Sequence, residues 1–314
     1  MIKLITDNDL DGNSCFIVAS IFLNEEIDVT KSNPKKVNKD VMDALINHKD
    51  YSKIFITDLS VSKEVAETLN EIGDKVCLLD HHISANFLND YAWANVHVEV
   101  NNRKTCGAEL FLNYLYENMN QNKIDKNHKI FDFVEIARLY DTWEWYNVYN
   151  DEVPKKMNDL MYIKGKDEFT EEMISKIKLG EEPFSPIDIA LLKFRQKEIE
   201  RYIEKMDEKI VTKKILGYKA GVVFAENFLS ELGNQLSERH PELDFIAMIN
   251  GNSVSYRTVK DDVNLSKVAK YFGGGGHIKA SGSGIDSKIS SKYIDSIFKV
   301  SIFDKIFKRK IYYK

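Results

Sequence analysis

The stretch IKLITDNDLDG, residues 2–12, decides the fold of this chain. A short apolar run ends in three carboxylates at alternate positions, Asp7, Asp9 and Asp11, and a glycine follows them. Carboxylates this close repel one another, and a multivalent cation is the usual explanation for such spacing. A calcium loop of the EF-hand type is excluded, because Val18 rather than a glutamate holds the twelfth position counted from Asp7.

Two further apolar runs end in the same way. KIFITD ends at Asp58, and KVCLLD ends at Asp80 and continues directly into His81 and His82. Any one of these acids alone is compatible with an ordinary surface turn. Three apolar strands that each stop at an acid instead predict a single site, built where parallel strands end in an open α/β sheet.

The segments between these runs predict a β-α-β-α-β order with right-handed crossovers and a mainly parallel sheet. Residues 24–36 are mostly polar, and residues 82–104 are expected to be irregular. The expected strands are residues 2–6, 53–57 and 75–79. The expected helices are residues 13–23, residues 37–46, and a third that Ser60 or Ser62 caps and Gly73 ends.

Residues 129–141 predict a helix that carries an acid on its inward face. Ile130, Val134, Ala137 and Asp141 are spaced at i, i+4, i+7 and i+11, which places them on one side of a helix. A carboxylate on an otherwise apolar stripe needs a partner, and a metal ion would serve.

The second half of the chain predicts a smaller α/β domain. A long charged helix is expected at residues 185–210 as a connector, and strands at 218–225, 245–249 and 253–259, with a hairpin turn at Asn250-Gly251. The expected organisation is an N-terminal α/β domain over residues 1–150, a helical linker region over 151–213 and a C-terminal α/β domain over 214–314.

A run of four glycines precedes His277 in the C-terminal part. Glycines let backbone N–H groups approach a phosphate closely, which makes Gly274, Gly275 and Gly276 candidates for anion binding. Arg257, on the strand before them, can supply a bidentate fork to the same phosphate. A flexible linker is the alternative. The consecutive glycines match neither a Walker motif nor a dinucleotide fingerprint.

The acids and the two adjacent histidines are more ligands than one cation needs. Mixed carboxylate and imidazole ligands suit Mn²⁺, and less specifically Mg²⁺ or Zn²⁺. Their number suits a two-metal site with ions roughly 3.5–4 Å apart, which activates water and stabilises charge during displacement at phosphorus.

Composition sets outer limits on the function. The 314 residues are 43% hydrophobic and 30% charged, as in a soluble globular protein, and five prolines argue against long disordered linkers. The net charge of −5 gives no overall signature of duplex-nucleic-acid binding, but an acidic total does not exclude a local basic groove.

The cysteines and the lack of long apolar runs predict a cytoplasmic protein without a membrane span. Cys15, Cys77 and Cys106 are widely separated and are expected to be buried, reduced thiols. The N-terminus lacks the regions of a signal peptide, and no apolar run reaches 18 residues. The basic tail, residues 299–314, is expected to form a closing helix, with a membrane-surface role as the alternative.

Five motifs together resemble those of the DHH phosphoesterase superfamily, in order and in spacing. They are DNDLDG at 7–12, TDLS at 57–60, DHH at 80–82, YDTW at 140–143 and GGGGHIKASG at 273–282. The last is similar to the DHH-associated C-terminal domain of RecJ-like exonucleases and bacterial nanoRNases. The length and the first motif resemble the NrnB-like oligoribonuclease branch. The resemblance covers residues 1–145 and 215–290.

The resemblance implies two Mn²⁺ ions, with Mg²⁺ as an alternative. Asp7 and Asp9 would hold the first ion and Asp58 would bridge both. The second ion would be held by Asp11, His81 and Asp141. Many relatives carry histidine where this chain has Asp7, although RecJ-like members carry aspartate there.

The remaining motif residues receive roles around these ions. Asp80 would orient His81 from behind, as a carboxylate commonly does for a metal-bound histidine, and His82 would face the phosphate. Arg257 and His277, with the backbone of the glycine run, would bind the terminal phosphate or the 3′-side nucleotide of the substrate.

The resemblance implies an Mn²⁺-dependent phosphodiesterase that releases nucleoside 5′-monophosphates from short single-stranded oligonucleotides in a cleft between two domains. The family leaves open the cleavage of linear or cyclic dinucleotides, the dephosphorylation of 3′-phosphoadenosine 5′-phosphate, and exonuclease action on single-stranded DNA. A nucleotide sensor or scaffold without activity, or a structural metal-binding protein, are the alternatives of other classes. A homodimer is also left open.

Overall fold

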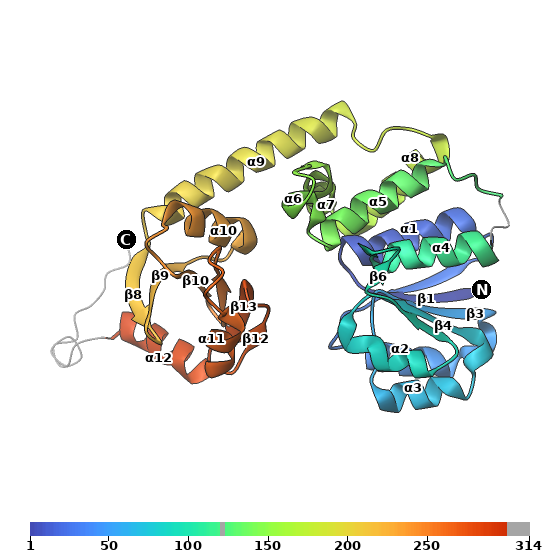
Figure 1. The fold of residues 1–314 in the computed structure, drawn as a ribbon, viewed down its shortest axis with the longest axis horizontal. Coiled ribbons are helices and arrows are strands. Elements are labelled where there is room, and N and C mark those ends of the chain that lie inside the picture. Colours follow the sequence, from blue (N-terminus) through green and yellow to red (C-terminus); the bar gives the residue numbers. More distant parts are fainter. Residues whose placement is uncertain (120–122, 300–314) are drawn as a thin grey trace, which may run out of the picture. The chain divides into compact units, whose positions relative to one another are not determined.

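The computed structural model describes residues 1–119 and 123–299. The chain divides into two compact units, Met1–Leu192 and Lys193–Lys314, and each contains its own central sheet (Figure 1). The expected α/β class, with a parallel N-terminal sheet and a smaller C-terminal sheet domain, is confirmed.

The N-terminal unit is built on a five-stranded parallel sheet of order β2-β1-β3-β4-β5. The strands are β1 (Ile2–Thr6), β2 (Ile27–Lys31), β3 (Lys53–Thr57), β4 (Val76–Asp80) and β5 (Ala94–Val96). In this order the chain moves outward in opposite directions from β1, which creates a switch point between β1 and β3. Ligands of open α/β sheets bind outside the carboxyl ends of strands at such a point.

Strand β2 lies in a segment for which no strand is predicted. All five of its residues are half-buried, and β1 is its one neighbour in the sheet. An edge strand of this kind needs no continuous apolar run, and its sequence IDVTK gives only a weak alternation of apolar and polar residues. The strands predicted at 2–6 and 53–57 are confirmed at the predicted bounds.

Helices cover both faces of this sheet (Figure 1). Leu4 and Phe55 point to one face and Ile56 to the other, as the alternation along a strand requires. The first face packs against α1 (Leu10–Phe22) and α4 (Gly107–Asn118). The helices α5 (Lys129–Asp141), α7 (Val153–Lys164) and α8 (Lys166–Leu179) pack on those two helices and on one another. The second face packs against α2 (Val37–Ile46) and α3 (Lys63–Asn70).

Two helix ends differ from the prediction. Helix α1 begins at Leu10, three residues early, because the Asp9 side chain caps it by accepting a hydrogen bond from the Gly12 N–H at 3.0 Å. Ser62 caps α3 as predicted, but α3 ends at Asn70, and Gly73 opens a separate 3-10 turn (η2, Gly73–Lys75) instead of ending the helix.

The remaining parts of the N-terminal unit are short. Residues 82–104, expected to be irregular, contain the 3-10 helix η3 (Ile83–Asp90) and, besides β5, the short strands β6 (Glu99–Val100) and β7 (Arg103–Lys104). The 3-10 turn η1 (His48–Asp50) and the short helix α6 (Glu144–Asn147) lie elsewhere in this unit.

Helices α7 and α8 belong to the core of the N-terminal unit. Met157, Leu160 and Phe169 pack with the residues of α1 and α4. The long helix α9 (Pro186–Asp207) contains the division between the units, so residues 151–192 lie in the N-terminal unit and do not form a separate linker.

The C-terminal unit is built on a six-stranded sheet of order β12-β13-β11-β10-β9-β8, in which only β9 and β10 pair in parallel. The strands are β8 (Val211–Ile215), β9 (Tyr218–Phe224), β10 (Phe245–Asn250), β11 (Ser253–Arg257), β12 (Gly275–Gly276) and β13 (Ala280–Gly284). The helices are α10 (Leu229–Arg239), α11 (Leu265–Tyr271) and α12 (Ser287–Ile297). Side chains alternate along β10, since Ile246 packs toward α10 and Phe245 toward α11.

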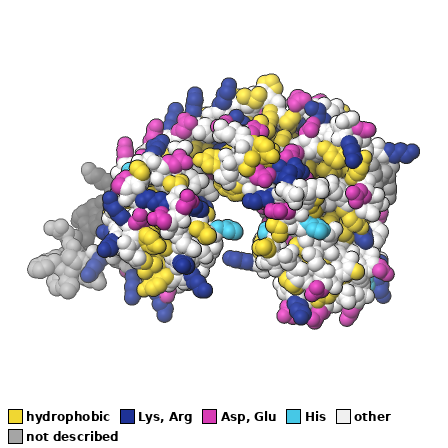
Figure 2. All heavy atoms as spheres, in the orientation of Figure 1, with side chains coloured by type: hydrophobic (Ala, Val, Ile, Leu, Met, Phe, Trp, Pro, Cys, Tyr) yellow, Lys and Arg dark blue, Asp and Glu magenta, His cyan; other side chains and the backbone are white. Residues whose placement is uncertain are grey.

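Three further expectations concern membrane-spanning helices, the charge of the surface and the basic tail. None of the helices in the described part of the chain has the length and apolar character needed to cross a membrane. Figure 2 shows acidic and basic side chains interspersed over the face in view, which agrees with the small net charge. The predicted closing helix at 299–314 falls, apart from Lys299, outside the described residues.

Candidate metal centre

Acids emerge from the carboxyl ends of three adjacent strands. Asp7 follows β1, Asp58 follows β3 and Asp80 is the last residue of β4. These strands are neighbours in the order β1-β3-β4, so the loops that carry the acids meet at one edge of the sheet.

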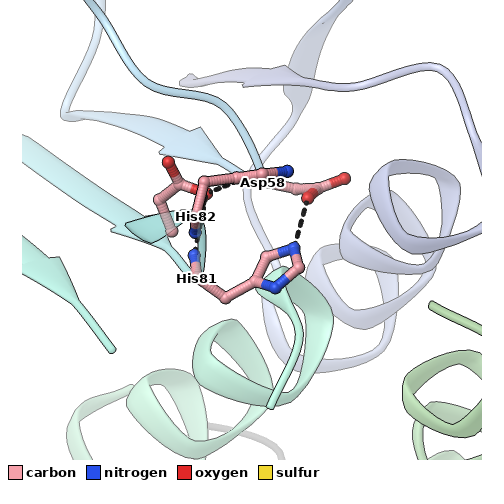
Figure 3. Close-up of side chains that lie close together, drawn as sticks. Asp58, His81 and His82 are labelled. Atoms are coloured by element: carbon pink, nitrogen blue, oxygen red, sulfur yellow. Dashed lines mark hydrogen bonds and ion pairs between the residues drawn. The ribbon is translucent and has the colours of Figure 1, made fainter. Parts of the chain in front are cut away.

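His81 lies at the centre of this acid cluster. Its Nε2 atom is 3.3 Å from Asp58 Oδ1, 3.5 Å from Asp141 Oδ2 and 3.9 Å from Asp11 Oδ2. Figure 3 shows the His81 ring turned toward the Asp58 carboxylate. Asp11, His81 and Asp141 offer ligand atoms that all lie within 4.8 Å of one another, so residues from three separate segments converge on one small space.

Asp80 positions His82 and not the ring of His81. Its Oδ1 atom accepts a hydrogen bond from His82 Nδ1 at 2.7 Å and from the His81 backbone N–H at 2.8 Å. The implied contact of Asp80 with the His81 ring is therefore not formed in this structure, because the Asp80 carboxylate holds the His82 ring, whose centroid lies 4.3 Å from that of His81. Asp58, Asp80, His81 and His82 form a second group with ligand atoms within 4.8 Å.

Asp7 and Asp9 lie on the same loop but outside these two groups. Asp9 is committed in part to capping α1, where one carboxylate oxygen accepts the Gly12 N–H. Burial, followed by repulsion from Asp11, raises the pKa of Asp9 to about 6. The charge of Asp9 nevertheless reaches the cluster, since it adds to the raised pKa of Asp58 and of Asp141.

Several buried polar atoms of the cluster have no hydrogen-bond partner among the described residues. They are Asp58 Oδ2, Asp80 Oδ2 and His81 Nε2. A buried polar atom without a partner is costly, and carboxylate oxygens and a neutral imidazole nitrogen are the atoms that bind Mn²⁺ or Mg²⁺. The donor set and its unsatisfied atoms thus fit a divalent metal ion.

The electrostatics of the cluster point the same way. Burial, followed by repulsion from Asp11 and Asp9, raises the pKa of Asp141 to about 8 and raises the pKa of Asp58 as well. Burial lowers the pKa of His81, which favours the neutral ring that can bind a metal. The hydrogen bond to Asp80 raises the pKa of His82 to about 9, so His82 is a cation beside the acids at neutral pH.

The metal-free folded state should therefore become less stable as the pH rises. An unperturbed aspartate titrates near 3.8, whereas Asp141 titrates near 8 in the fold. The folded state binds more protons than the unfolded state between those values, so the free energy of unfolding falls with rising pH across that window. His82, with its raised pKa, adds to this fall above its ordinary value of 6.5, and His81, with its lowered pKa, opposes it.

Thermal unfolding of the chelator-treated protein at about pH 5.5 and about pH 8 measures this dependence. We expect a lower Tm at the higher pH, and a flatter profile for an Asp141→Asn variant. Mn²⁺ should raise the Tm more at the higher pH, since its ligands must be deprotonated. Parallel pH profiles for both proteins would contradict the raised pKa of Asp141.

Two glycines that carry no predicted role make the cluster possible. Asp58 adopts a left-handed backbone with φ of 56°, which is rare for a residue other than glycine and marks strain that neighbouring contacts must hold. Gly107 lies against it, and a Cβ atom on Gly107 would come within 2.6 Å of Asp58 Cβ. Gly12 lies equally close to the Asp7 carbonyl, where a Cβ atom would come within 2.0 Å of the oxygen.

The start of α4 fixes Asp11. The backbone N–H groups of Gly107 and Ala108 donate to the Asp11 carboxylate at 2.6 and 2.8 Å. The first N–H groups of a helix lack acceptors within the helix, and the Asp11 carboxylate accepts two of them here.

A Gly107→Ala variant should lose about 1–3 kcal/mol of stability, the usual cost of overpacking a closed core. It should also bind metal more weakly, because Asp58 must move. Urea unfolding and a Mn²⁺ titration measure the two effects. Gly284→Ala is the matched control, since a Cβ atom there meets nothing within 4 Å. Equal stability of the two variants would contradict the close approach of Gly107 to Asp58.

A buried arginine also lies behind the cluster and carries no predicted role. Arg138 is fully buried on α5, one turn before Asp141. It donates to Glu135 at 2.7 Å, to Glu144, and to the Lys104 carbonyl at 3.0 Å. These contacts anchor the end of α5 that carries Asp141. The charge of Arg138 can be buried because these partners accept its hydrogen bonds. Glu135 lies on the preceding turn of α5, whereas Glu144 and Lys104 lie outside the helix.

The aromatic residues after Asp141 form a partly exposed group. Trp145 is buried among them. Trp143 is 43% exposed, has a left-handed backbone with φ of 59°, and contacts Trp145 with ring centroids 5.8 Å apart. Tyr146 is 52% exposed and also contacts Trp145.

The glycine run of the C-terminal unit is a tight hairpin. Gly275 and Gly276 form β12 and pair with β13, and the Gly274 N–H donates to the Ala269 carbonyl at 2.8 Å. A Cβ atom on Gly274 would lie 2.0 Å from the Gly282 carbonyl oxygen, so these glycines allow close packing of the strands. The Gly274 N–H is thus occupied, contrary to its expected role toward a phosphate.

Arg257 and His277 lie close to this hairpin. Arg257 ends β11, where its Nη1 atom donates to the Tyr256 carbonyl at 2.9 Å and its Nη2 atom to Ser230 Oγ at 3.3 Å. His277 is exposed at the turn between β12 and β13. Its backbone N–H donates to the carbonyl of Ala280, the residue that pairs with Arg257 across the sheet.

Comparisons with known proteins identify relatives of this chain. Residues 1–137 match the model of the DHH family, N-terminal domain. The chain is 37% identical over 295 residues to oligoribonuclease NrnB of Bacillus subtilis (strain 168), a match that covers 91% of this chain and 73% of that protein.

Two solved structures share the fold at low sequence identity. RecJ of Thermus thermophilus, in complex with Mn²⁺, has a TM-score of 0.60 and 12% identity, and the match covers 94% of this chain and 51% of RecJ. The pGpG-specific phosphodiesterase PggH of Vibrio cholerae has a TM-score of 0.54 and 13% identity over 95% of this chain and 97% of PggH.

Proposed function

Because the chain belongs to the DHH family, we propose that this metal-dependent phosphoesterase hydrolyses short single-stranded oligonucleotides to nucleoside 5′-monophosphates. The observation that carries the proposal is the convergence of Asp58, Asp141 and Asp11 on His81 Nε2 within 3.9 Å. The likeness to NrnB, an oligoribonuclease by name, supports the choice of substrate.

The chain's acids would hold two divalent cations, with Mn²⁺ as the proposed species and Mg²⁺ as the alternative. Asp7 and Asp9 would hold one ion, Asp11, His81 and Asp141 the other, and Asp58 would contact both. When bound, such ions supply a nucleophile at neutral pH and stabilise the charge of a phosphoryl transition state. The unsatisfied Asp58 Oδ2 atom agrees with a role toward a second ion, since Asp58 Oδ1 already faces His81.

His82 would bind the phosphoryl group of the substrate. Its Nδ1 atom is held by Asp80, and its pKa of about 9 keeps the ring positively charged. The ring is about half exposed, so its remaining nitrogen is accessible to a ligand. A fixed cation beside the acids offsets the charge of a phosphodiester and costs no reorganisation during the reaction.

Exposed aromatic rings beside Asp141 would contact the bases. Stacking on Trp143 or Tyr146 is sequence-tolerant and contributes about 1–3 kcal/mol per base in single-strand binding. The strained backbone of Trp143 is consistent with a side chain held outward for binding.

Arg257, His277 and the hairpin glycines Gly275 and Gly276 would bind the terminal phosphate or the 3′-side nucleotide. An Arg257→Gln variant should raise KM about tenfold to a hundredfold with little change in kcat, since a charged hydrogen bond contributes about 1.5–3 kcal/mol. Arg201→Gln, which alters an exposed arginine on α9, is the control. An unchanged KM for the Arg257 variant would remove Arg257 from the binding site.

A substrate panel with Mn²⁺, read by product identity, tests the function. The panel contains labelled RNAs of about two to five nucleotides, the equivalent DNAs, linear and cyclic dinucleotides, and 3′-phosphoadenosine 5′-phosphate; a two-metal site can act on any of these phosphate esters. We expect the short RNAs to be cleaved fastest, to 5′-monophosphates. Preferential cleavage of another class would replace the oligoribonuclease assignment, and no cleavage of any substrate by metal-loaded protein would overturn it.

A further inference from the structure

A cavity of about 1070 Å³ lies in the N-terminal unit at the amino ends of β3, β4 and β5. Its volume lies just above the usual range of small-molecule sites, roughly 300–1,000 Å³. The segments that line it precede these strands: η1, η2 and the residues before Ala94. The metal centre follows the carboxyl ends of β1, β3 and β4, whereas this cavity lies at the amino ends of the strands, on the opposite side of the sheet along the strand direction.

Three lysines line the cavity and none is neutralised. Within the described residues, Lys49, Lys53 and Lys75 form no ion pair with a carboxylate. Lys53 Nζ donates to the Asp74 carbonyl at 3.1 Å, and Lys75 Nζ to the Tyr51 carbonyl at 3.0 Å. Carbonyl oxygens hold an ammonium group in place but leave its full positive charge for another ligand.

Two acids on the same lining offset part of this charge. Glu71 and Asp74 are exposed, as Lys49 is. The lining therefore combines three lysines with two carboxylates, which leaves one positive charge in excess. This excess of positive charge contrasts with a chain whose net charge is −5.

Two aromatic side chains, Trp93 and Tyr114, lie in the wall among smaller apolar and polar residues. The Trp93 Nε1–H donates to Asn70 Oδ1 at 3.2 Å, and its ring stacks on Tyr91 with centroids 5.2 Å apart. Trp93 is 7% exposed, so only an edge of its ring faces the cavity. Tyr114 completes this side of the cavity. An anion with a planar body suits such a wall, since its charged end can meet the lysines while its ring lies against aromatic side chains.

We propose that this cavity binds a nucleoside monophosphate, with the phosphate on Lys49, Lys53 and Lys75 and the base against Tyr114 and the exposed edge of Trp93. The assignment is independent of hydrolysis, because every residue of the cavity lies outside the metal centre. A ligand bound there would occupy the amino ends of the same strands whose carboxyl ends carry the acids.

Photolabelling of the full chain with 8-azido-AMP, in the presence of a metal chelator, locates the site directly. We expect label on the peptides that contain Trp93 or Tyr114, and unlabelled AMP should suppress it. Label confined to peptides of the C-terminal unit or of the Asp7–Asp11 loop would overturn the proposal, whatever the protein hydrolyses.

Charge reversal then tests the lysines, read as AMP competition on those peptides. Lys49→Glu combined with Lys53→Glu should weaken competition about tenfold or more, because two attractions to phosphate become repulsions. Lys36→Glu with Lys39→Glu, lysines at the start of α2 and outside the cavity, should leave it unchanged. Equal effects of the two double variants would contradict the site. Inorganic phosphate competing as well as AMP would remove the nucleoside from the assignment.

Discussion

An Asp58→Asn variant is expected to hydrolyse phosphodiesters about a thousandfold or more slowly than the unaltered protein. Loss of about 4 kcal/mol of transition-state stabilisation corresponds to that factor. Asparagine has nearly the shape of aspartate and accepts the left-handed backbone that Asp58 adopts, so the change removes charge with little effect on the main chain. Initial rates on a dinucleotide with Mn²⁺ measure the loss.

Unfolding of the same variant separates chemistry from folding. Burial and the charges of Asp11 and Asp9 raise the pKa of Asp58, which means that its ionised form destabilises the metal-free fold. Asp58→Asn should therefore keep or raise the Tm of the chelator-treated protein, while it loses the rise that Mn²⁺ gives. Asp43→Asn, on the exposed side of α2, should change neither property. Activity within tenfold of normal would exclude Asp58 from the reaction.

An Arg138→Met variant is expected to lose about 3–5 kcal/mol of stability. Methionine fills much of the same volume but leaves Glu135, Glu144 and the Lys104 carbonyl without the partner that they share. Glu135 keeps a second ion pair, but the Glu144 carboxylate and the Lys104 carbonyl lose the donor that they contact, and an uncompensated partner of a buried charge is costly. Denaturant unfolding measures this loss, and activity should fall as well, because Asp141 follows on the same helix.

A surface ion pair provides the comparison for Arg138. Arg239 lies 3.1 Å from Asp207, and its side chain is 40% exposed. Exposed pairs contribute about 0–1 kcal/mol, so Arg239→Met should destabilise the protein only slightly. If the two variants unfold at the same denaturant concentration, Arg138 does not anchor α5 in the way the contacts indicate.

The strands and acids of the N-terminal sheet could be predicted from sequence because their signals are local. An apolar run that stops at an acid defines both a buried strand and the end at which its side chain emerges. The position of Asp141 could be predicted for a similar reason, since helical periodicity alone places it on the inward face of α5. The edge strand β2 escaped prediction because it is half exposed and needs no apolar run.

The finer arrangement of the site depends on contacts that no local pattern encodes. Whether Asp80 meets His81 or His82 depends on side-chain torsions at the end of β4. Gly107 matters only because α4 approaches Asp58 within the distance of one methyl group. The glycine run illustrates the same limit: consecutive glycines fit a phosphate-binding loop, yet here they allow a tight hairpin in which the Gly274 N–H already has an acceptor.

Anomalous diffraction at the manganese edge, from crystals grown with Mn²⁺, tests the two-metal centre directly. We expect two peaks that share Asp58 as a ligand, one beside Asp7 and Asp9 and the other beside His81 and Asp141. A single peak, or peaks away from Asp58, would contradict the two-metal centre on which the proposed hydrolysis depends.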